Sequence, residues 1–215
     1  MGRHGFCFVA PVTDISLVLL DLNGVLYHYD RAARVAVVAA VAGCDEAAVQ
    51  AAIWDSGFED AGDAGAMDAD AYLGGFGAAI GYEITEAEWV AALKNAIAPI
   101  PEALGLFARA RPAVGCAVLT NNNLLVQRHF SVLYPEAAAL VGDRAFVSAE
   151  FRTRKPEAAV YRACLARLGV PPAATLFIDD SEANVQGAIA AGLAGHHCRQ
   201  PSDLAGILND RGLIV

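Results

Sequence analysis

Residues 15–25 read ISLVLLDLNGV, an apolar run that ends at Asp21 and is followed by a turn at Gly24. A short apolar run that stops at a turn is typical of a fully buried strand in a parallel sheet. Open α/β sheets bind their ligands just beyond the carboxyl ends of the strands, which is where Asp21 is expected. A carboxylate in that position can act as a nucleophile or hold a metal ion.

The second half of the chain alternates between apolar runs and helical patterns. Strands are predicted at 116–119, 145–148, 175–178 and 195–197, and helices at 102–110, 124–133, 157–168 and 182–191. Such alternation favours a parallel sheet with right-handed crossovers. We therefore expect an α/β fold, a doubly wound parallel sheet with a Rossmann-like core.

The segment between these parts has a different pattern. Helices are predicted at 32–42, 46–54, 68–80 and 85–96, and no strand is expected between them. Thr85 and Glu88 have the spacing of a capping box at the start of the last helix. We expect a small α-helical cap at 31–98, inserted after the first strand, and a core domain made of 1–30 and 99–215.

Composition excludes several classes of function. The chain has 215 residues, 56% of them hydrophobic, and a net charge of −9, and residues 31–98 hold eleven acidic and three basic residues. Nucleic acid is a poor partner for such a surface, because phosphate contacts need basic side chains. No apolar run reaches the length of a membrane span, so no membrane partner is expected. Residues 1–11 are read as an N-terminal extension rather than a signal peptide.

Five dispersed cysteines show no metal-binding spacing. This pattern argues against a disulfide framework and against a zinc site. A reducing, cytoplasmic location is the expectation.

Polar residues also follow the other predicted strands, and they suggest phosphate chemistry. Asp21 should approach the pair Asp179-Asp180, and carboxylates brought together need a cation such as Mg²⁺. Thr120 offers a hydroxyl, and the backbone of residues 121–123 offers N–H groups at a helix start. Lys155 adds a positive charge for a phosphoryl group. Each of these residues alone could be a cap or a loop residue, and their common position at strand ends carries the argument.

These motifs resemble those of the haloacid dehalogenase superfamily, and the resemblance covers about residues 15–192. It is carried by DLNGV at 21–25, TN at 120–121, RKPE at 154–157 with Tyr161, and FIDDSEAN at 177–184. The nearest branch resembles sugar-phosphate phosphatases and the phosphatase half of soluble epoxide hydrolases.

The resemblance implies a role for each matching residue. Asp21 would form an aspartyl-phosphate, and the backbone carbonyl of Asn23 would bind Mg²⁺. Thr120 and Asn121 would bind phosphate, which Lys155 would neutralise. Asp180 would bind the metal directly, with Asp179 in support.

Asn23 departs from the pattern of typical phosphatases in this superfamily, which have an aspartate there as general acid and base. An amide can neither donate nor accept the proton in that way, although its carbonyl can still bind metal. His28 is a possible substitute.

Three functions remain open from the sequence. The first is an Mg²⁺-dependent phosphatase of a small phosphorylated metabolite. The second is a catalytically weakened relative that binds a phosphorylated ligand or a protein. The third is a 2-haloacid dehalogenase, a reaction that needs no metal and against which the Asp179-Asp180 pair argues. Candidates for substrate contacts in the helical segment are Arg31, Arg34, Trp54, Phe58 and Met67.

Overall fold

The computed structural model describes residues 15–110 and 112–214, and the extension expected at residues 1–11 lies outside them. Within the described residues, five parallel strands form one sheet in the order β5-β4-β1-β6-β7. The strands are β1 (Leu17–Leu20), β4 (Gly115–Thr120), β5 (Ala145–Val147), β6 (Thr175–Asp179) and β7 (Ala194–His197). The α/β class and the parallel sheet predicted from the sequence are confirmed.

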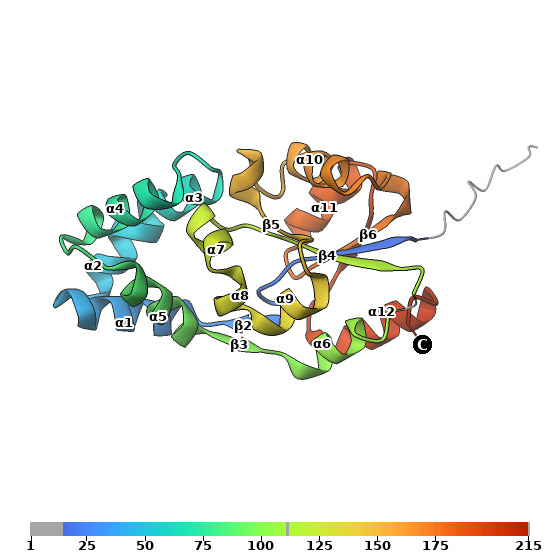
Figure 1. Cartoon of the computed structure of the whole chain (residues 1–215), viewed down its shortest axis with the longest axis horizontal. Coiled ribbons are helices and arrows are strands. Elements are labelled where there is room, and N and C mark those ends of the chain that lie inside the picture. The colour runs from blue at the N-terminus through green and yellow to red at the C-terminus, as the bar shows by residue number, and fades with distance from the viewer. Residues whose placement is uncertain (1–14, 111, 215) are drawn as a thin grey trace, which may run out of the picture.

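Helices cover both faces of this sheet, as Figure 1 shows. Val18 and Leu20 of β1 face a core shared with α6 (Pro101–Phe107), α9 (Pro135–Val141) and α12 (Leu204–Asp210). Leu17 and Leu19 point to the opposite face, toward α10 (Ala158–Leu168) and α11 (Glu182–Ala190). Successive side chains of a strand alternate between faces, so a strand covered on both sides is apolar throughout. This explains the uninterrupted run that precedes Asp21.

The helical block, residues 31–96, lies together at the left of Figure 1, beyond the end of the sheet. It contains α1 (Arg31–Ala42), α2 (Glu46–Gln50), α3 (Phe58–Asp63), α4 (Ala69–Ile80) and α5 (Glu86–Ala96), with a π-helical turn at Ala51–Asp55. Its buried centre includes Tyr72, Phe76 and Trp89.

The helix starts in this block are set by local side chains. Asp30 and Asp68 accept hydrogen bonds from the backbone at the starts of α1 and α4. Thr85 and Glu88 form the predicted capping box of α5. In the described part of the chain no single helix is long and apolar enough to cross a membrane, and only Arg31–Ala42 with Glu46–Asp55, bent by 111°, reaches that length as a pair.

The structure differs from the sequence-based prediction at the two ends of the block. The strands β2 (Tyr27–Tyr29) and β3 (Ile97–Pro99) pair antiparallel where the chain enters and leaves it. These two strands were not predicted, whereas the expectation of no strand between the four predicted helices is confirmed. Three-residue strands show no periodicity, and these two are stabilised by pairing with each other across about 70 residues.

Some helices also differ from those predicted from the sequence. The helix predicted at 124–133 is two short helices, α7 (Leu124–Arg128) and α8 (Phe130–Leu133). The helices α3, α9 and α12 were not predicted. All three are of six or seven residues, too short for a clear helical pattern.

Gly187 lets α11 lie against the loop that follows β5. A Cβ atom at this position would lie 2.0 Å from the backbone oxygen of Pro156, the residue after Lys155. That separation is far below van der Waals contact, and a backbone oxygen cannot swing aside as a side chain would.

We expect Gly187→Ala to lower the free energy of unfolding by about 1–3 kcal/mol, the usual cost of overpacking. Gly206→Ala is the matched control on α12, because its added Cβ would meet nothing within 4 Å. That control should be neutral or stabilising by up to about 1 kcal/mol. Urea unfolding of both variants makes the comparison, and equal stabilities would contradict the close packing of α11 on Pro156.

Candidate functional site

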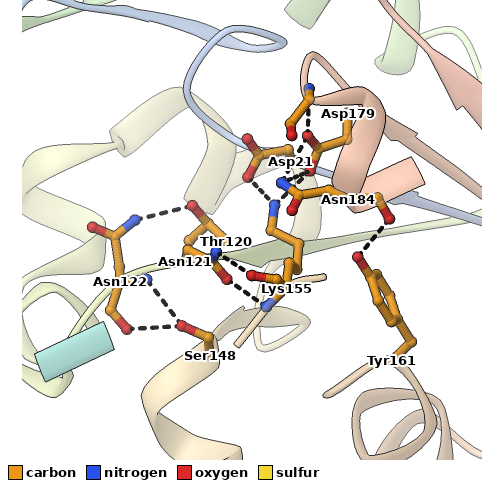
Figure 2. A network of polar contacts seen from close by, with 10 residues as sticks. Asp21, Thr120, Asn121, Asn122, Ser148, Lys155, Tyr161, Asp179 and Asn184 are labelled. Carbon is orange, nitrogen blue, oxygen red and sulfur yellow. Dashed lines mark hydrogen bonds and ion pairs between the residues drawn. The ribbon is translucent and has the colours of Figure 1, made fainter. Parts of the chain in front are cut away.

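Lys155 is the centre of a buried ion network at the carboxyl edge of the sheet. Its Nζ atom lies 2.6 Å from Asp21 Oδ1 and 2.6 Å from Asp179 Oδ2. Asp21 directly follows β1 and Asp179 ends β6, two neighbouring strands, so the parallel register brings the carboxylates together. Figure 2 shows the ammonium between the two acids. The lysine is only 2% exposed, which means that protein groups rather than water balance its charge.

Amide side chains hold this network in place. The Asn121 side chain forms two hydrogen bonds with the backbone of Lys155: its Nδ2 donates to the lysine carbonyl at 3.0 Å, and its Oδ1 accepts from the lysine N–H at 2.9 Å. Asn184 Nδ2 donates to both carboxylate oxygens of Asp179, at 3.0 and 3.2 Å. Tyr161 in turn donates to the Asn184 carbonyl at 2.6 Å. The loop and the strand end are thus fixed relative to each other (Figure 2).

Three carboxyl groups meet beside Lys155 in an arrangement that suits a cation. One oxygen from each of Asp21, Asp179 and Asp180 lies within 4.8 Å of the others. Three carboxylates and one ammonium leave an excess of negative charge, and hard oxygen ligands are what Mg²⁺ prefers. Gly24 makes room for this cluster: a Cβ there would lie 2.2 Å from Asp180 Oδ2, and its φ of +86° favours glycine.

The electrostatics of the site reflect the same charge excess. Burial raises the pKa of Asp21 to about 7; the Lys155 ammonium opposes that rise, and the Asp179 carboxylate adds to it. Burial, and then Asp179, also raise the pKa of Asp180 above its usual range. Burial alone would lower the pKa of Lys155, but Asp21 and Asp179 outweigh it, so the pKa of the ammonium is raised. A bound cation would favour the ionised carboxylates.

The loop after β4 carries the predicted phosphate-binding residues. Thr120 is buried at the end of β4, and its Oγ1 accepts a hydrogen bond of 2.9 Å from Asn122 Nδ2. The backbone N–H of Asn122 donates to Ser148 Oγ at 3.1 Å. Asn123 Oδ1 accepts from the N–H groups of residues 125 and 126. Of the backbone donors expected to face a phosphate, the Asn122 N–H is therefore engaged within the protein, and the Thr120 hydroxyl hydrogen is left to donate.

A cavity of about 210 Å³ separates this loop from the helical block. From the sheet side it is lined by Asn23, Asn121 and Asn122. From the block and its entry it is lined by Tyr29, Arg31, Arg34, Trp54, Glu59, Asp60, Asp63 and Leu93. The cavity is below the range of about 300–1,000 Å³ that is usual for drug-sized ligands, so it suits a small molecule.

Arg34 is a buried cation in the wall of this cavity. Its Nη1 lies 2.9 Å from Glu59 Oε1, and its guanidinium stacks on Trp54 and Trp89 at 5.3 and 5.1 Å from the ring centroids. Arg34 Nε and Nη2 are buried without a hydrogen-bond partner. Unpaired buried donors are costly, so these atoms are candidates for a ligand contact.

The other candidates named from the sequence divide into two groups. Arg31 and Trp54 line the cavity. Phe58 packs on Tyr72, with ring centroids 5.3 Å apart, and belongs to the centre of the block. Met67 lines a separate pocket beside Ala149 and Arg152. His28 is exposed on β2 and is not among the residues that line the cavity.

Asn23 lines the cavity, and its Oδ1 atom is buried without a hydrogen-bond partner. The residue begins the turn that returns to Tyr27, in which Gly24 donates to the Tyr27 carbonyl at 2.7 Å. The predicted metal ligand is the backbone carbonyl of Asn23; that role stays a prediction.

The sequence reasoning overlooked two residues that organise the site. Ser148 directly follows β5, as Asp21 follows β1, so the strand-end rule could have identified it. Asn184 lies five residues after Asp179, in the first turn of α11, which is a detectable spacing.

This chain is similar to one protein family and to several solved structures. A model of the haloacid dehalogenase-like hydrolase family matches residues 15–192. A HAD family enzyme from Bacteroides thetaiotaomicron is similar over 91% of this chain and 98% of its own, with 20% identity and a TM-score of 0.74. A predicted HAD-like family hydrolase from Porphyromonas gingivalis covers 85% of this chain and 90% of its own, with 23% identity and a TM-score of 0.72.

A third similar structure is that of a dehalogenase. The L-2-haloacid dehalogenase from Xanthobacter autotrophicus, solved with chloropropionic acid covalently bound, covers 94% of this chain and 84% of its own, with 18% identity and a TM-score of 0.61. At these identities the solved structures establish the shared fold. The family model covers most of the chain, and the chain therefore belongs to the haloacid dehalogenase-like hydrolases.

Proposed function

We propose that this hydrolase is an Mg²⁺-dependent phosphatase of a small phosphorylated metabolite, acting through an aspartyl-phosphate on Asp21. The observation that carries the proposal is the buried Asp21–Lys155–Asp179 network, with Asp180 beside it. Asn121, which holds the Lys155 backbone, links this network to the small cavity. The network combines a carboxylate nucleophile, a fixed positive charge and a set of oxygen ligands.

Asp21 would attack the phosphorus atom of the substrate. The new bond joins an Asp21 carboxylate oxygen to phosphorus as the bond from phosphorus to the substrate oxygen breaks. Lys155 and the Thr120 hydroxyl would stabilise the charge on the transferring group. Water would then attack phosphorus, release inorganic phosphate and restore the Asp21 carboxylate.

The residues that would hold Mg²⁺ are Asp21, Asp180 and the backbone carbonyl of Asn23, with Asp179 in support. When bound, the ion supplies Lewis-acid stabilisation of the phosphoryl oxygens and offsets the carboxylate charges. Asp179 also holds Lys155, which gives this residue a role that does not depend on the metal.

A related structure supports the choice of phosphate chemistry. The enzyme from Bacteroides thetaiotaomicron was also solved in complex with magnesium and inorganic phosphate, with 21% identity and a TM-score of 0.69 to this chain. The similarity to the L-2-haloacid dehalogenase solved with chloropropionic acid covalently bound argues for the alternative, in which Asp21 would attack carbon. The triad of carboxylates beside one lysine favours the metal-dependent reaction, because without a cation these groups repel one another.

The helical block would act as a cap that closes the cavity over the substrate. Ion pairs join it to the core: Arg128 lies 2.7 Å from Asp70 and 2.9 Å from Glu86, and Arg154 pairs with Asp60. Arg34, with its unpaired buried nitrogens, would contact polar groups of the substrate. A closed cap keeps bulk water away from the reacting group.

We expect Asp21→Asn to lower the turnover of p-nitrophenyl phosphate by at least about 100-fold, because an amide cannot form the covalent intermediate. Excess chelator should abolish wild-type turnover, and added Mg²⁺ should restore it. Asp143→Asn, at an exposed loop position, is the control for loss of one carboxylate. Full activity in chelator would exclude the proposed reaction, and turnover of 2-chloropropionate instead would favour the dehalogenase.

Binding of Mg²⁺ should stabilise the fold independently of any turnover. At about one hundred times its Kd, a ligand that binds only the native state adds about 2.7 kcal/mol to the free energy of unfolding. We expect Mg²⁺ to raise the Tm of the wild type and of Asp143→Asn, and to have a much smaller effect on Asp180→Asn. Equal shifts in all three proteins would remove Asp180 from the metal site.

A further inference from the structure

Departure of an alkoxide from phosphorus requires a proton, and Asn23 has no acidic proton to give. Asn23 nevertheless lines the cavity in which the leaving group of the proposed reaction would lie. Another acid that reaches the same cavity is therefore needed for efficient hydrolysis of alkyl phosphates.

Asp63, the last residue of α3, reaches this cavity from the helical block. It is 9% exposed, and its Oδ1 atom is buried with no hydrogen-bond partner. An ionised carboxylate with an unpaired buried oxygen is costly, whereas the neutral acid needs less solvation and carries an O–H donor. The surroundings of Asp63 therefore favour a carboxyl group that keeps its proton.

Charged side chains around Asp63 also affect whether it keeps its proton. Glu59 and Asp60 lie on its own helix, Arg34 faces it from α1, and Arg154 faces it from the loop before Lys155. Burial raises the pKa of Asp63 well above its usual range, and Glu59 adds to the rise. The two arginines oppose this shift, and Asp60 strengthens it.

The backbone of Asp63 is fixed directly to the phosphate-binding loop. Ser148 Oγ donates to the Asp63 carbonyl at 2.7 Å and accepts from the Asn122 N–H at 3.1 Å. The preceding residue, Gly62, lies beside the same loop, because an added Cβ would be in ordinary contact with Asn123 Cβ at 3.5 Å. Asp63 thereby lines the cavity that Asn23, Asn121 and Asn122 line from the other side.

The other carboxyl groups that line the cavity are already paired. Glu59 accepts from Arg34 through one oxygen and from Tyr72 through the other. Asp60 pairs with Arg154. Within the described residues, Asp63 is the cavity carboxyl that has an oxygen buried without a partner. His28, the substitute considered from the sequence, is exposed outside the cavity.

We propose that Asp63 is the general acid of this enzyme, donating its proton to the leaving oxygen in place of the missing acid at position 23. The assignment rests on the proposed phosphatase function. As the bond between Asp21 and phosphorus forms, the bond from phosphorus to the substrate oxygen breaks, and that oxygen takes the proton of Asp63. Asp63, now a carboxylate, takes a proton back from the water that attacks the aspartyl-phosphate.

The decisive test compares two leaving groups in wild type and Asp63→Asn. Nitrophenolate leaves without a proton, whereas an alkoxide needs one. We expect Asp63→Asn to lower kcat/KM for an alkyl phosphate by about 10²–10⁴-fold, the usual contribution of a general acid. The kcat/KM for p-nitrophenyl phosphate should change far less. Asp45→Asn, an exposed carboxylate of the same block without a capping hydrogen bond, is the matched control and should leave both values unchanged.

The pH profile of the wild type provides a second readout that needs no variant. A general acid works only while protonated, so kcat/KM for the alkyl phosphate should fall as pH rises through the raised pKa of Asp63. The fall in kcat/KM at high pH should be much smaller for p-nitrophenyl phosphate. Identical profiles for the two substrates would overturn the assignment even if Asp63→Asn failed to fold.

A double variant tests whether residues 23 and 63 serve the same oxygen. Asn23→Asp should restore alkyl phosphate hydrolysis in the Asp63→Asn background, because it returns an acid to the other wall of the cavity. A double variant that still hydrolyses p-nitrophenyl phosphate but regains no alkyl phosphate hydrolysis would contradict the proposal. A fall in kcat/KM for the alkyl phosphate alone, seen in Tyr29→Phe and not in Asp63→Asn, would assign the proton to Tyr29. That result would also overturn the proposal.

The outcomes separate the two proposals. A wild type that hydrolyses neither phosphate ester in Mg²⁺ would refute the phosphatase function and the role of Asp63 together. A wild type that hydrolyses both, with the same ratio of rates in Asp63→Asn, would refute the role of Asp63 alone.

Discussion

The Lys155 ammonium, held 2.6 Å from both Asp21 and Asp179 at 2% exposure, is the interaction on which the rest of the site depends. A buried charge is tolerated only when partners replace the water that it has lost, and removing one partner leaves the other charges uncompensated. Three separate segments must therefore meet at one point: the end of β1, the end of β6 and the loop after β5. Asn121, Asn184 and the close packing of Gly187 on Pro156 hold that meeting point.

The same network sets the chemical task of the cavity. The end of β1 fixes Asp21, and contacts with Asp21, Asp179 and Asn121 fix Lys155. In the proposed reaction the loop after β1 offers no acid for the leaving group, because Asn23 stands there. The segment that ends α3 is fixed to the loop after β4 through Ser148, and it carries a buried carboxyl group into the cavity. An acid on the helical block would couple proton transfer to the seating of that block on the core. Enzymes often complete their catalytic groups in this way on closure.

The sequence predicts much of this arrangement, for physical reasons. A strand buried on both faces must be apolar throughout, so β1 and β6 are visible as runs that end at Asp21 and Asp179. Parallel strands place their ends on one edge, so the convergence of Asp21, Lys155 and Asp179 follows from order along the chain. The capping box at Thr85 is equally local.

What the sequence could not predict depends on contacts between distant segments. The pairing of β2 with β3 has too few residues to leave a pattern, and α3 is one of several acidic stretches in the block. Nothing local distinguishes Asp63 from Asp60, since only the folded structure shows that one is paired and the other is not. Likewise, the capping role of Asn123 could be expected, but not the use of Asn121 to clamp the Lys155 backbone.

Whether Asp21 becomes phosphorylated is the central question, and mass spectrometry of the protein quenched in acid during steady turnover answers it most directly. We expect one phosphoryl group on the peptide that contains Asp21, present with Mg²⁺ and substrate and lost when the quench follows exhaustion of the substrate. Turnover of a phosphate ester with that peptide unmodified at every time point, under quench conditions that preserve acyl phosphates, would contradict it.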